Sequence, residues 1–161
     1  MRIERFTTLA QEALANAQGL AVRASNADIS PLHLLAALLE TQDGVATSIL
    51  DRAGIDGSRV LEVTQASLSR MPTVTGGSVQ TSQQLVQVLA NAEEFARKMK
   101  DQYVSTEHLL LALVDTPSEA RDALSTCGAD KGNVKQAIED IRKASGVSNV
   151  TDPGAERTLK H

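Results

Sequence analysis

Two histidines, His33 and His108, are the side chains that could most readily do chemistry, because imidazole can bind metals and transfer protons near neutral pH. Each lies three residues after a serine in nearly the same run of letters, DISPLHLLAALL at residues 28–39 and YVSTEHLLLALV at residues 103–114. A metal site on such a helix would need another ligand three or four residues further on, and alanine or leucine stands at those positions. We therefore predict that neither histidine binds metal and that each ring hydrogen-bonds near the start of its own helix.

The rest of the chain also lacks the residue sets that catalysis or cofactor binding requires. A histidine acting as a general base would need a nucleophile and an orienting acid, and the sequence does not indicate such a set. The glycine pair in TGGSVQTS, residues 75–82, lacks the lysine and the spacing of a phosphate-binding loop. Cys127 is the only cysteine and has no basic neighbour, so we expect an unreactive thiol. These observations predict no catalytic residues, no metal and no cofactor in this chain.

Composition narrows the class of protein further. Of the 161 residues, 42% are hydrophobic but only 2% are aromatic, and a chain rich in alanine and leucine favours packed helices over sheets. The net charge of −4, without any run of Lys or Arg, argues against a nucleic-acid partner. No apolar run approaches the roughly 20 residues of a membrane-spanning helix. The start lacks the apolar core of a secretory leader, and one cysteine cannot form an internal disulfide. We therefore expect a cytoplasmic protein with no membrane partner.

Helical periodicity and capping residues predict an all-α fold of eight helices. Apolar residues recur at helical spacing in eight stretches, and a residue that can cap a helix stands at or near the start of each. The expected starts are at or near Thr8, Ser30, Asp43, Asp56, Thr81, Ser105, Thr116 and Asp130. Pro72, Gly76 and Gly77 interrupt the pattern between the fourth and fifth helices, which predicts a non-helical linker at residues 71–80.

The sequence is a tandem duplication. Adding 75 to the residue number carries Leu14 onto Leu89, Ser30 onto Ser105 and His33 onto His108, and we call this relation the repeat offset. Near the end of the repeat the offset falls to 74, which carries Leu50, Gly54 and Asp56 onto Leu124, Gly128 and Asp130.

The duplication predicts how the domain is organised. We expect one domain at residues 1–145, with repeat one at about 1–70, the linker at 71–80, repeat two at about 81–145, and a tail at 146–161. Two repeats are too few for a solenoid, so we expect them to pack around a pseudo-two-fold axis with a groove at their seam.

Phe95 is the one aromatic residue whose position suggests a binding role. On a helical wheel it lies at the edge of the apolar stripe that contains Leu85, Val88 and Leu89, where the ring would be partly exposed. Two interpretations stay open: packing at the edge of the core, or one wall of an apolar binding groove.

With these residues in view, the chain resembles the double-repeat N-terminal domain of the Clp ATPases, and within that group the N-domains of ClpB-type protein disaggregases. The resemblance is carried by RFTTLAQEALANAQGLA at residues 5–21, MPTVTGGSVQTSQQL at 71–85 and YVSTEHLLLALV at 103–114, and GAERTLKH at 154–161 resembles the segment that leads into the first ATPase module. It implies that the ATPase modules, with their ATP and Mg²⁺, lie outside this chain, so this part alone would not be an enzyme. It also implies a parent AAA+ protein that is a homo-hexamer, and we expect the isolated domain to be a monomer.

The resemblance further implies a role and a set of site residues. The domain would capture exposed apolar segments of unfolded or aggregated polypeptides. The matching polar positions are Thr7, Asp101 and Glu107, and the matching groove positions are Leu89, Asn91, Phe95 and His108. Because Asn91 and His108 are polar, Leu89 and Phe95 are the expected apolar anchors. Two alternatives stay open: the N-domain of a protease-linked Clp ATPase of the ClpC or ClpA type that docks adaptor proteins, and a passive spacer that gates the pore.

Overall fold

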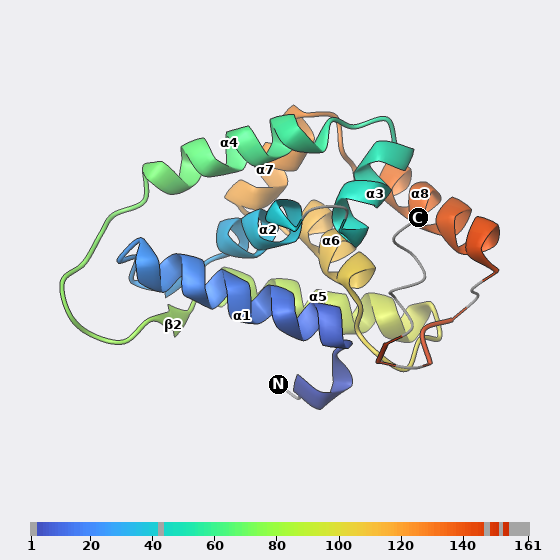
Figure 1. Ribbon diagram of the computed structural model, residues 1–161, viewed down its shortest axis with the longest axis horizontal. Coiled ribbons are helices and arrows are strands. Elements are labelled where there is room, and N and C mark those ends of the chain that lie inside the picture. Colours follow the sequence, from blue (N-terminus) through green and yellow to red (C-terminus); the bar gives the residue numbers. More distant parts are fainter. Residues whose placement is uncertain (1–2, 42–43, 147–148, 152, 155–161) are drawn as a thin grey trace.

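The computed structural model describes residues 3–41, 44–146, 149–151 and 153–154, and within them the chain forms eight α-helices (Figure 1). In chain order the elements are a 3-10 helix η1 (Ile3–Arg5), α1 (Thr8–Arg23), β1 (Asp28–Ile29), α2 (Pro31–Glu40), α3 (Val45–Arg52), α4 (Gly57–Ser69), β2 (Gln80–Thr81), α5 (Gln83–Lys98), α6 (Thr106–Asp115), α7 (Glu119–Thr126) and α8 (Lys131–Ser145). The predicted all-α class and the eight helices are confirmed. The two short strands were not predicted. None of the helices in the described ranges is long and apolar enough to cross a membrane.

The duplication is visible in the helix boundaries. The bounds of α1 and α2, moved by the repeat offset, coincide with those of α5 and α6. Helices α7 and α8 each begin one position earlier than the same offset would place the starts of α3 and α4. The lost residue therefore falls between α6 and α7. Even an unusual backbone conformation is repeated, since Ser25 and Lys100, which the repeat offset relates, have positive φ angles of 57° and 61°.

The central helices α2 and α6 are buried on all sides because the surrounding helices cover them. Residues 31–39 of α2 and 106–114 of α6 are all buried. Figure 1 shows these two helices in the middle, with α1 and α5 on one side and α3, α4, α7 and α8 on the other. A helix that is hydrophobic all round can only be stable inside a protein. Each repeat therefore depends on the other to bury its central helix.

The two repeats also exchange short backbone pairings, which shows the pseudo-two-fold relation directly. Phe6, before α1, forms a parallel bridge with Val104 of repeat two, and Thr81 of β2 pairs in parallel with Ile29 of repeat one. The repeat offset relates these two pairs to each other. In each pair the following residue adds a backbone hydrogen bond between the repeats. Thr7 N–H donates to the Val104 carbonyl at 2.9 Å, and Ser82 N–H donates to the Ile29 carbonyl at 3.0 Å.

The segment between α4 and β2 contains no helix, in agreement with the prediction from its proline and glycines. Gly76 and Gly77 have φ angles of 75° and 83°, a region that L-residues with side chains seldom adopt. Val74 N–H donates to the Ser25 carbonyl at 2.8 Å, so the segment packs along the end of α1 before it reaches repeat two.

Three predicted N-caps are wrong, and tertiary contacts explain the differences. Helix α1 is capped by Thr7 and not Thr8, and α5 by Ser82 and not Thr81, because the residue before each helix is held by the pairing between repeats. Helix α7 is capped by Ser118, whose Oγ accepts from Arg121 N–H at 3.2 Å. Thr116, the predicted cap, instead ends α6, and its Oγ1 accepts a hydrogen bond from Asn91 at 2.8 Å.

The positive φ at Lys100 leads to a stability prediction. A left-handed conformation costs a residue with a side chain about 1–2 kcal/mol relative to the right-handed one, and glycine avoids this cost. Lys100 is exposed. Lys100→Gly is therefore expected to raise the free energy of unfolding by about 0.5–1 kcal/mol, after allowance for the greater freedom of glycine in the unfolded chain. Urea unfolding measures the change. The control Ala90→Gly, at an exposed position inside α5, is expected to lower the same quantity by about 1 kcal/mol. A destabilising effect of Lys100→Gly would contradict the prediction.

Candidate functional site

His33 and His108 hold equivalent positions and make equivalent hydrogen bonds. Nδ1 of His108 accepts from Ser105 N–H at 2.8 Å, and Nδ1 of His33 accepts from Ser30 N–H at 2.9 Å. Because a backbone amide can only donate, Nδ1 is the acceptor and the ring proton lies on Nε2. Burial lowers the pKa of His33 below its usual 6.5, which is consistent with a neutral ring. The prediction that each ring bonds near its own helix start is confirmed.

The partner of Nε2 distinguishes the repeats. His33 Nε2 donates to Asn26 Oδ1 at 2.9 Å, whereas His108 Nε2 donates to Asp101 Oδ2 at 2.7 Å. Asn26 and Asp101 are themselves related by the repeat offset. Repeat two therefore carries a carboxylate where repeat one carries a neutral amide.

Ser105, His108 and Asp101 have the order of contacts found in a catalytic triad, but they cannot work as one. The Ser105 hydroxyl lies 2.9 Å from His108 Nδ1. However, both residues are 0% exposed, and the Nδ1 lone pair already accepts from a backbone amide. A nucleophile needs access to a substrate and a base with a free lone pair. The arrangement is therefore structural.

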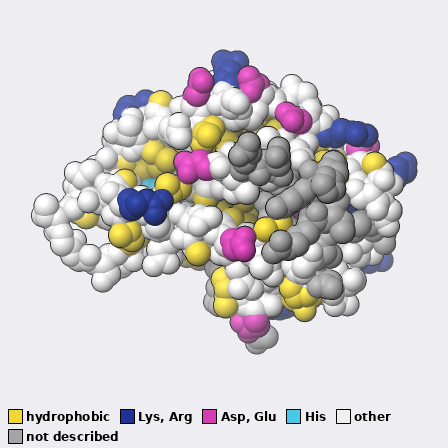
Figure 2. Space-filling view, in the orientation of Figure 1, with side chains coloured by type: hydrophobic (Ala, Val, Ile, Leu, Met, Phe, Trp, Pro, Cys, Tyr) yellow, Lys and Arg dark blue, Asp and Glu magenta, His cyan; other side chains and the backbone are white. Residues whose placement is uncertain are grey.

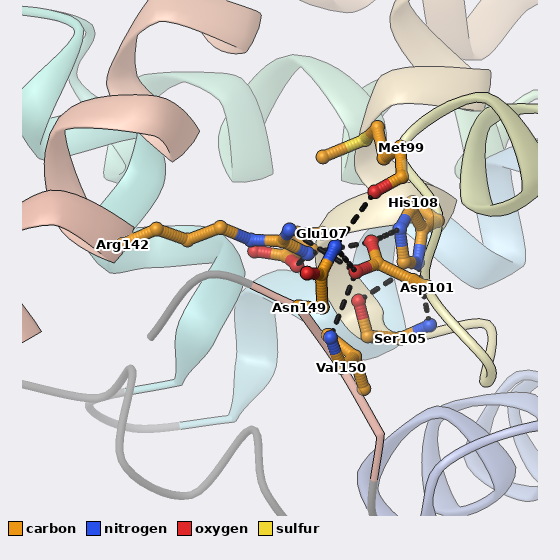
Figure 3. A network of polar contacts seen from close by, with 8 residues as sticks. All are labelled: Met99, Asp101, Ser105, Glu107, His108, Arg142, Asn149 and Val150. Carbon is orange, nitrogen blue, oxygen red and sulfur yellow. Dashed lines mark hydrogen bonds and ion pairs between the residues drawn. The ribbon is translucent and has the colours of Figure 1, made fainter. Parts of the chain in front are cut away.

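A buried ionic cluster surrounds Asp101 (Figure 3). The guanidinium of Arg142, reaching in from α8, donates to Asp101 Oδ2 at 2.7 Å and to Oδ1 at 3.2 Å, and it also bonds the carboxylate of Glu107. Val150 N–H donates to Asp101 Oδ1 at 2.7 Å, and His108 completes the set. Asp101 is 9% exposed, Arg142 7% and Glu107 1%. The cluster therefore ties the loop between α5 and α6, the first turn of α6, α8 and the segment after α8 together in the protein interior.

The charge state of Asp101 follows from its donors. Burial alone raises the pKa of a carboxyl group, because the charged form loses its hydration. Here hydrogen bonds from His108, Arg142 and the Val150 amide outweigh burial and lower the pKa of Asp101 from 3.8 to about 2. Asp101 is therefore an ionised carboxylate at neutral pH, which fits its role as acceptor for several donors at once.

Asp101, Glu107 and His108 also have the donor atoms of a metal site. One ligand atom from each lies within 4.8 Å of the other two. The sequence argument looked for ligands only along the helix after His108. It therefore missed the carboxylate of Asp101, in the loop before α6, and that of Glu107, which directly precedes His108. The Arg142 guanidinium already bonds both carboxylates and supplies the compensating charge. That no metal binds here stays a prediction.

The structure separates the seven predicted site residues into two groups. Thr7, Asp101, Glu107 and His108 are buried: the last three form the ionic cluster, and Thr7 caps α1, its Oγ1 accepting from Ala10 N–H at 3.2 Å. Leu89 is only 4% exposed and packs in the core, so it offers little surface to a partner.

Asn91 and Phe95 form the second group and lie half-buried on α5. Asn91 is held by Thr116, and the Lys131 ammonium lies 5.4 Å from the centre of the Phe95 ring. Phe95 packs against the edge of the core and still presents part of its ring. Of the two expected apolar anchors, Phe95 is thus the one that is accessible.

Repeat one has a hollow at the place that corresponds to Asn91 and Phe95 of repeat two. It has a volume of about 230 Å³ and is lined by Asn16, Leu20, Arg23, Ala37, Glu40 and Thr41. Asn16 and Leu20 correspond to Asn91 and Phe95 under the repeat offset. Figure 2 shows hydrophobic side chains reaching the surface nearby, over α2 and between α1 and α4. Both repeats therefore present a half-buried apolar side chain next to a polar amide.

Sequence reasoning missed Arg142, Asn149 and Val150, three residues that complete the cluster. Arg142 does carry a local signal, because it follows Val134 and Ile138 at intervals of four and so falls on the apolar stripe of α8. An arginine on such a stripe is expected to need a buried acid. Asn149 and Val150 lie in the tail and give no comparable signal.

Comparison with known proteins identifies the family. The sequence model of the Clp repeat (R) N-terminal domain matches residues 5–124. The chain is 37% identical over 160 residues to the chaperone protein ClpB of Rhodopirellula baltica, and 35% identical over 162 residues to that of Propionibacterium freudenreichii subsp. shermanii. These matches cover 99% of this chain but only 18% and 19% of the two chaperones, so the chain spans about a fifth of their length.

Solved structures agree with this assignment. The crystal structure of the Hsp104 N-terminal domain from Candida albicans superposes with a TM-score of 0.79 at 27% identity, covering 93% of this chain and 97% of that one. The complex of the ClpV N-domain with a VipB peptide has the same fold, with a TM-score of 0.69 at 19% identity, covering 84% and 86% of the two chains. The duplicated helices, the exchanged pairings and these matches together show that the chain belongs to the Clp repeat N-terminal domain family.

Proposed function

We propose that this chain is the substrate-binding N-terminal module of a ClpB-like, ATP-dependent protein disaggregase, and that it captures exposed apolar segments of unfolded or aggregated polypeptides. The observation that carries the proposal is the similarity to ClpB chaperones along almost the whole chain. It is supported by the ClpV N-domain, a protein of the same fold that was solved with a bound peptide. ATP and Mg²⁺ would bind in modules outside this chain. The whole protein would be a cytoplasmic homo-hexamer, and the isolated domain a monomer.

The surface around Phe95 is the best candidate for this binding. Phe95 and Asn91 lie on one face of α5, where the ring offers apolar area. The neighbouring Asn91 amide bonds Thr116 and Gln87, which fixes the polar edge of this surface. Burying an apolar client side chain against the ring contributes roughly 1.5–3 kcal/mol. Ordering a flexible client opposes that gain, so we expect a dissociation constant of about tens of micromolar to millimolar. Several copies in one particle would restore affinity through avidity.

Phe95→Ala tests the proposed surface. It is expected to weaken binding of a permanently unfolded client to the isolated domain by about 1 kcal/mol, roughly a fivefold rise in the dissociation constant, because it removes most of the apolar contact area. Titration of the isotope-labelled domain followed by NMR measures the affinity and locates the contact. Circular dichroism must show that the variant is folded.

Two variants serve as matched controls. Val86 is 44% exposed and lies nine residues before Phe95, on the opposite side of α5, so Val86→Ala should leave the affinity unchanged. Leu20→Ala removes the counterpart of Phe95 in repeat one. If Leu20→Ala weakens binding and Phe95→Ala does not, the client groove lies in repeat one. Unchanged affinity in both variants would exclude these surfaces, and binding only of folded adaptors would favour the ClpC or ClpA type of function.

A further inference from the structure

The chain after α8 folds back over the ionic cluster and is held there by specific hydrogen bonds. We call the residues Asn149–Thr151 and Pro153 the C-terminal strap. Val150 is 0% exposed, its N–H donates to Asp101 Oδ1 at 2.7 Å, and its carbonyl accepts from Gln102 N–H at 2.8 Å. The Asn149 side chain donates to the Met99 carbonyl at 2.9 Å (Figure 3). The strap is therefore docked on the loop between α5 and α6.

The strap also reaches the first turn of the domain. The Pro153 carbonyl accepts from Thr8 N–H at 3.1 Å, which satisfies one of the free amides at the start of α1. The adjacent Thr7 pairs with Val104. The start of α1, the loop before α6 and the strap thus meet at one junction.

Repeat one has an equivalent segment with different chemistry, residues 72–74, which we call the first strap. After α4, Thr73 forms a bridge with Asn26, whose side chain donates to the Pro72 carbonyl at 3.2 Å. An asparagine can donate to a strap carbonyl, whereas Asp101 as a carboxylate can only accept from a strap amide. The first strap is also followed by β2 and α5, which are folded into the same domain, so it is fixed at both ends.

We infer that the C-terminal strap undocks and redocks as a unit while the eight helices stay folded, with Asp101 as its anchor. The helices share one continuous hydrophobic core, and Val150 is not part of it. Among the strap residues that the structure describes, Val150 contributes the one fully buried apolar side chain. Segments with few buried contacts open locally at a lower free energy than the whole domain. Undocking would free the C-terminal strap from the helices, and a stretch of six chain positions, at about 3.3 Å per residue, adds roughly 20 Å to the reach of any following segment.

This inference assigns Asp101 a positioning role. The carboxylate would set how far the eight helices can move from any segment beyond the strap, without touching a client polypeptide. The inference does not depend on the proposed client surface, because Phe95 and Asn91 make none of the strap's hydrogen bonds described above. A domain that binds no client could still have an opening strap.

Native-state hydrogen exchange tests the inference directly. The Val150 and Gln102 amides are expected to be protected at least tenfold relative to an unstructured peptide, yet to exchange at least tenfold faster than Leu110 in the centre of α6. Low concentrations of urea should leave their exchange nearly unchanged while they accelerate that of Leu110, because a local opening exposes little surface. Equal protection and equal urea dependence of all three amides would overturn the inference, as would a complete lack of protection at Val150 and Gln102.

Val150→Asp provides the matching variant, because it places a second carboxylate beside Asp101. It is expected to lower the protection of the Gln102 amide at least tenfold and to leave that of Leu110 unchanged. Val74→Asp, on the first strap at a position 43% exposed, is the control and should leave both amides as in the original protein. Unchanged Gln102 protection in Val150→Asp would contradict the inference. If Val150→Asp does not fold, the urea dependence of exchange in the unsubstituted protein decides the question.

Discussion

Replacing Arg142 with leucine is expected to destabilise the domain by about 3–5 kcal/mol, because it removes the guanidinium that bonds two buried carboxylates. Asp101 and Glu107 would then lie together in the interior with their charges uncompensated. Urea unfolding at neutral pH, followed by circular dichroism, measures the loss. The control is Arg97→Leu: the Arg97 side chain is 74% exposed and pairs with Glu94 on the surface, so the expected loss is below about 1 kcal/mol. A loss below about 1 kcal/mol for Arg142→Leu as well would show that the cluster is not the close ionic set described above.

Repeat one indicates how the loss could be reversed. Its residues Asn26, Leu32 and Leu68 stand at the positions equivalent to Asp101, Glu107 and Arg142. The fold therefore accepts an uncharged set at this place. The triple variant Asp101→Asn/Glu107→Leu/Arg142→Leu is expected to recover most of the stability lost in Arg142→Leu, because replacing a complete buried ion network by apolar groups is often neutral. A triple variant as unstable as the single one would mean that repeat two needs these charges to fold.

Acid is expected to remove about 2 kcal/mol of the free energy of unfolding through Asp101 alone. Its pKa is lowered from 3.8 to about 2 in the folded protein, so its stabilising contribution is complete above about pH 4 to 5 and is lost as the pH falls toward 2. The side chain is fully buried, so solvent does not screen its partners. The measurement is a series of urea unfolding curves between pH 6 and pH 2.5.

Asp101→Asn isolates this contribution from the other carboxylates that titrate in the same range. The variant keeps an acceptor for His108, as Asn26 does for His33, but it has no group to protonate. The difference in unfolding free energy between the original protein and Asp101→Asn should therefore narrow as the pH falls. A difference that stays constant from pH 6 to pH 2.5 would show that Asp101 is not held ionised by the cluster.

The helices and their order could be predicted because the residues that define a helix lie within it or next to its ends. An apolar stripe runs along the helix that it defines, and a capping serine or aspartate or a closing glycine lies within about one turn of the helix end that it defines. Ser30, Ser105 and Asp130 cap their helices as predicted. The cap assignments at Thr8, Thr81 and Thr116 were wrong because pairing between the repeats and the contact with Asn91 decide those helix ends.

The duplication, the all-α class and the hydrogen bonds of the His33 and His108 rings could be predicted from the sequence, since a fixed offset and a ring bonded three residues back need no knowledge of distant contacts. Which polar residues meet could not be predicted, because it depends on contacts between distant segments. Arg142 reaches Glu107 across 35 positions and Asp101 across 41, and Val150 reaches Asp101 across 49. The tertiary structure also decided that Leu89 is buried and Phe95 accessible, although both lie on one helix. The physical reason is that a burial pattern shows which face of a helix is covered, while the covering element, and the charge it brings, come from the packing of distant segments.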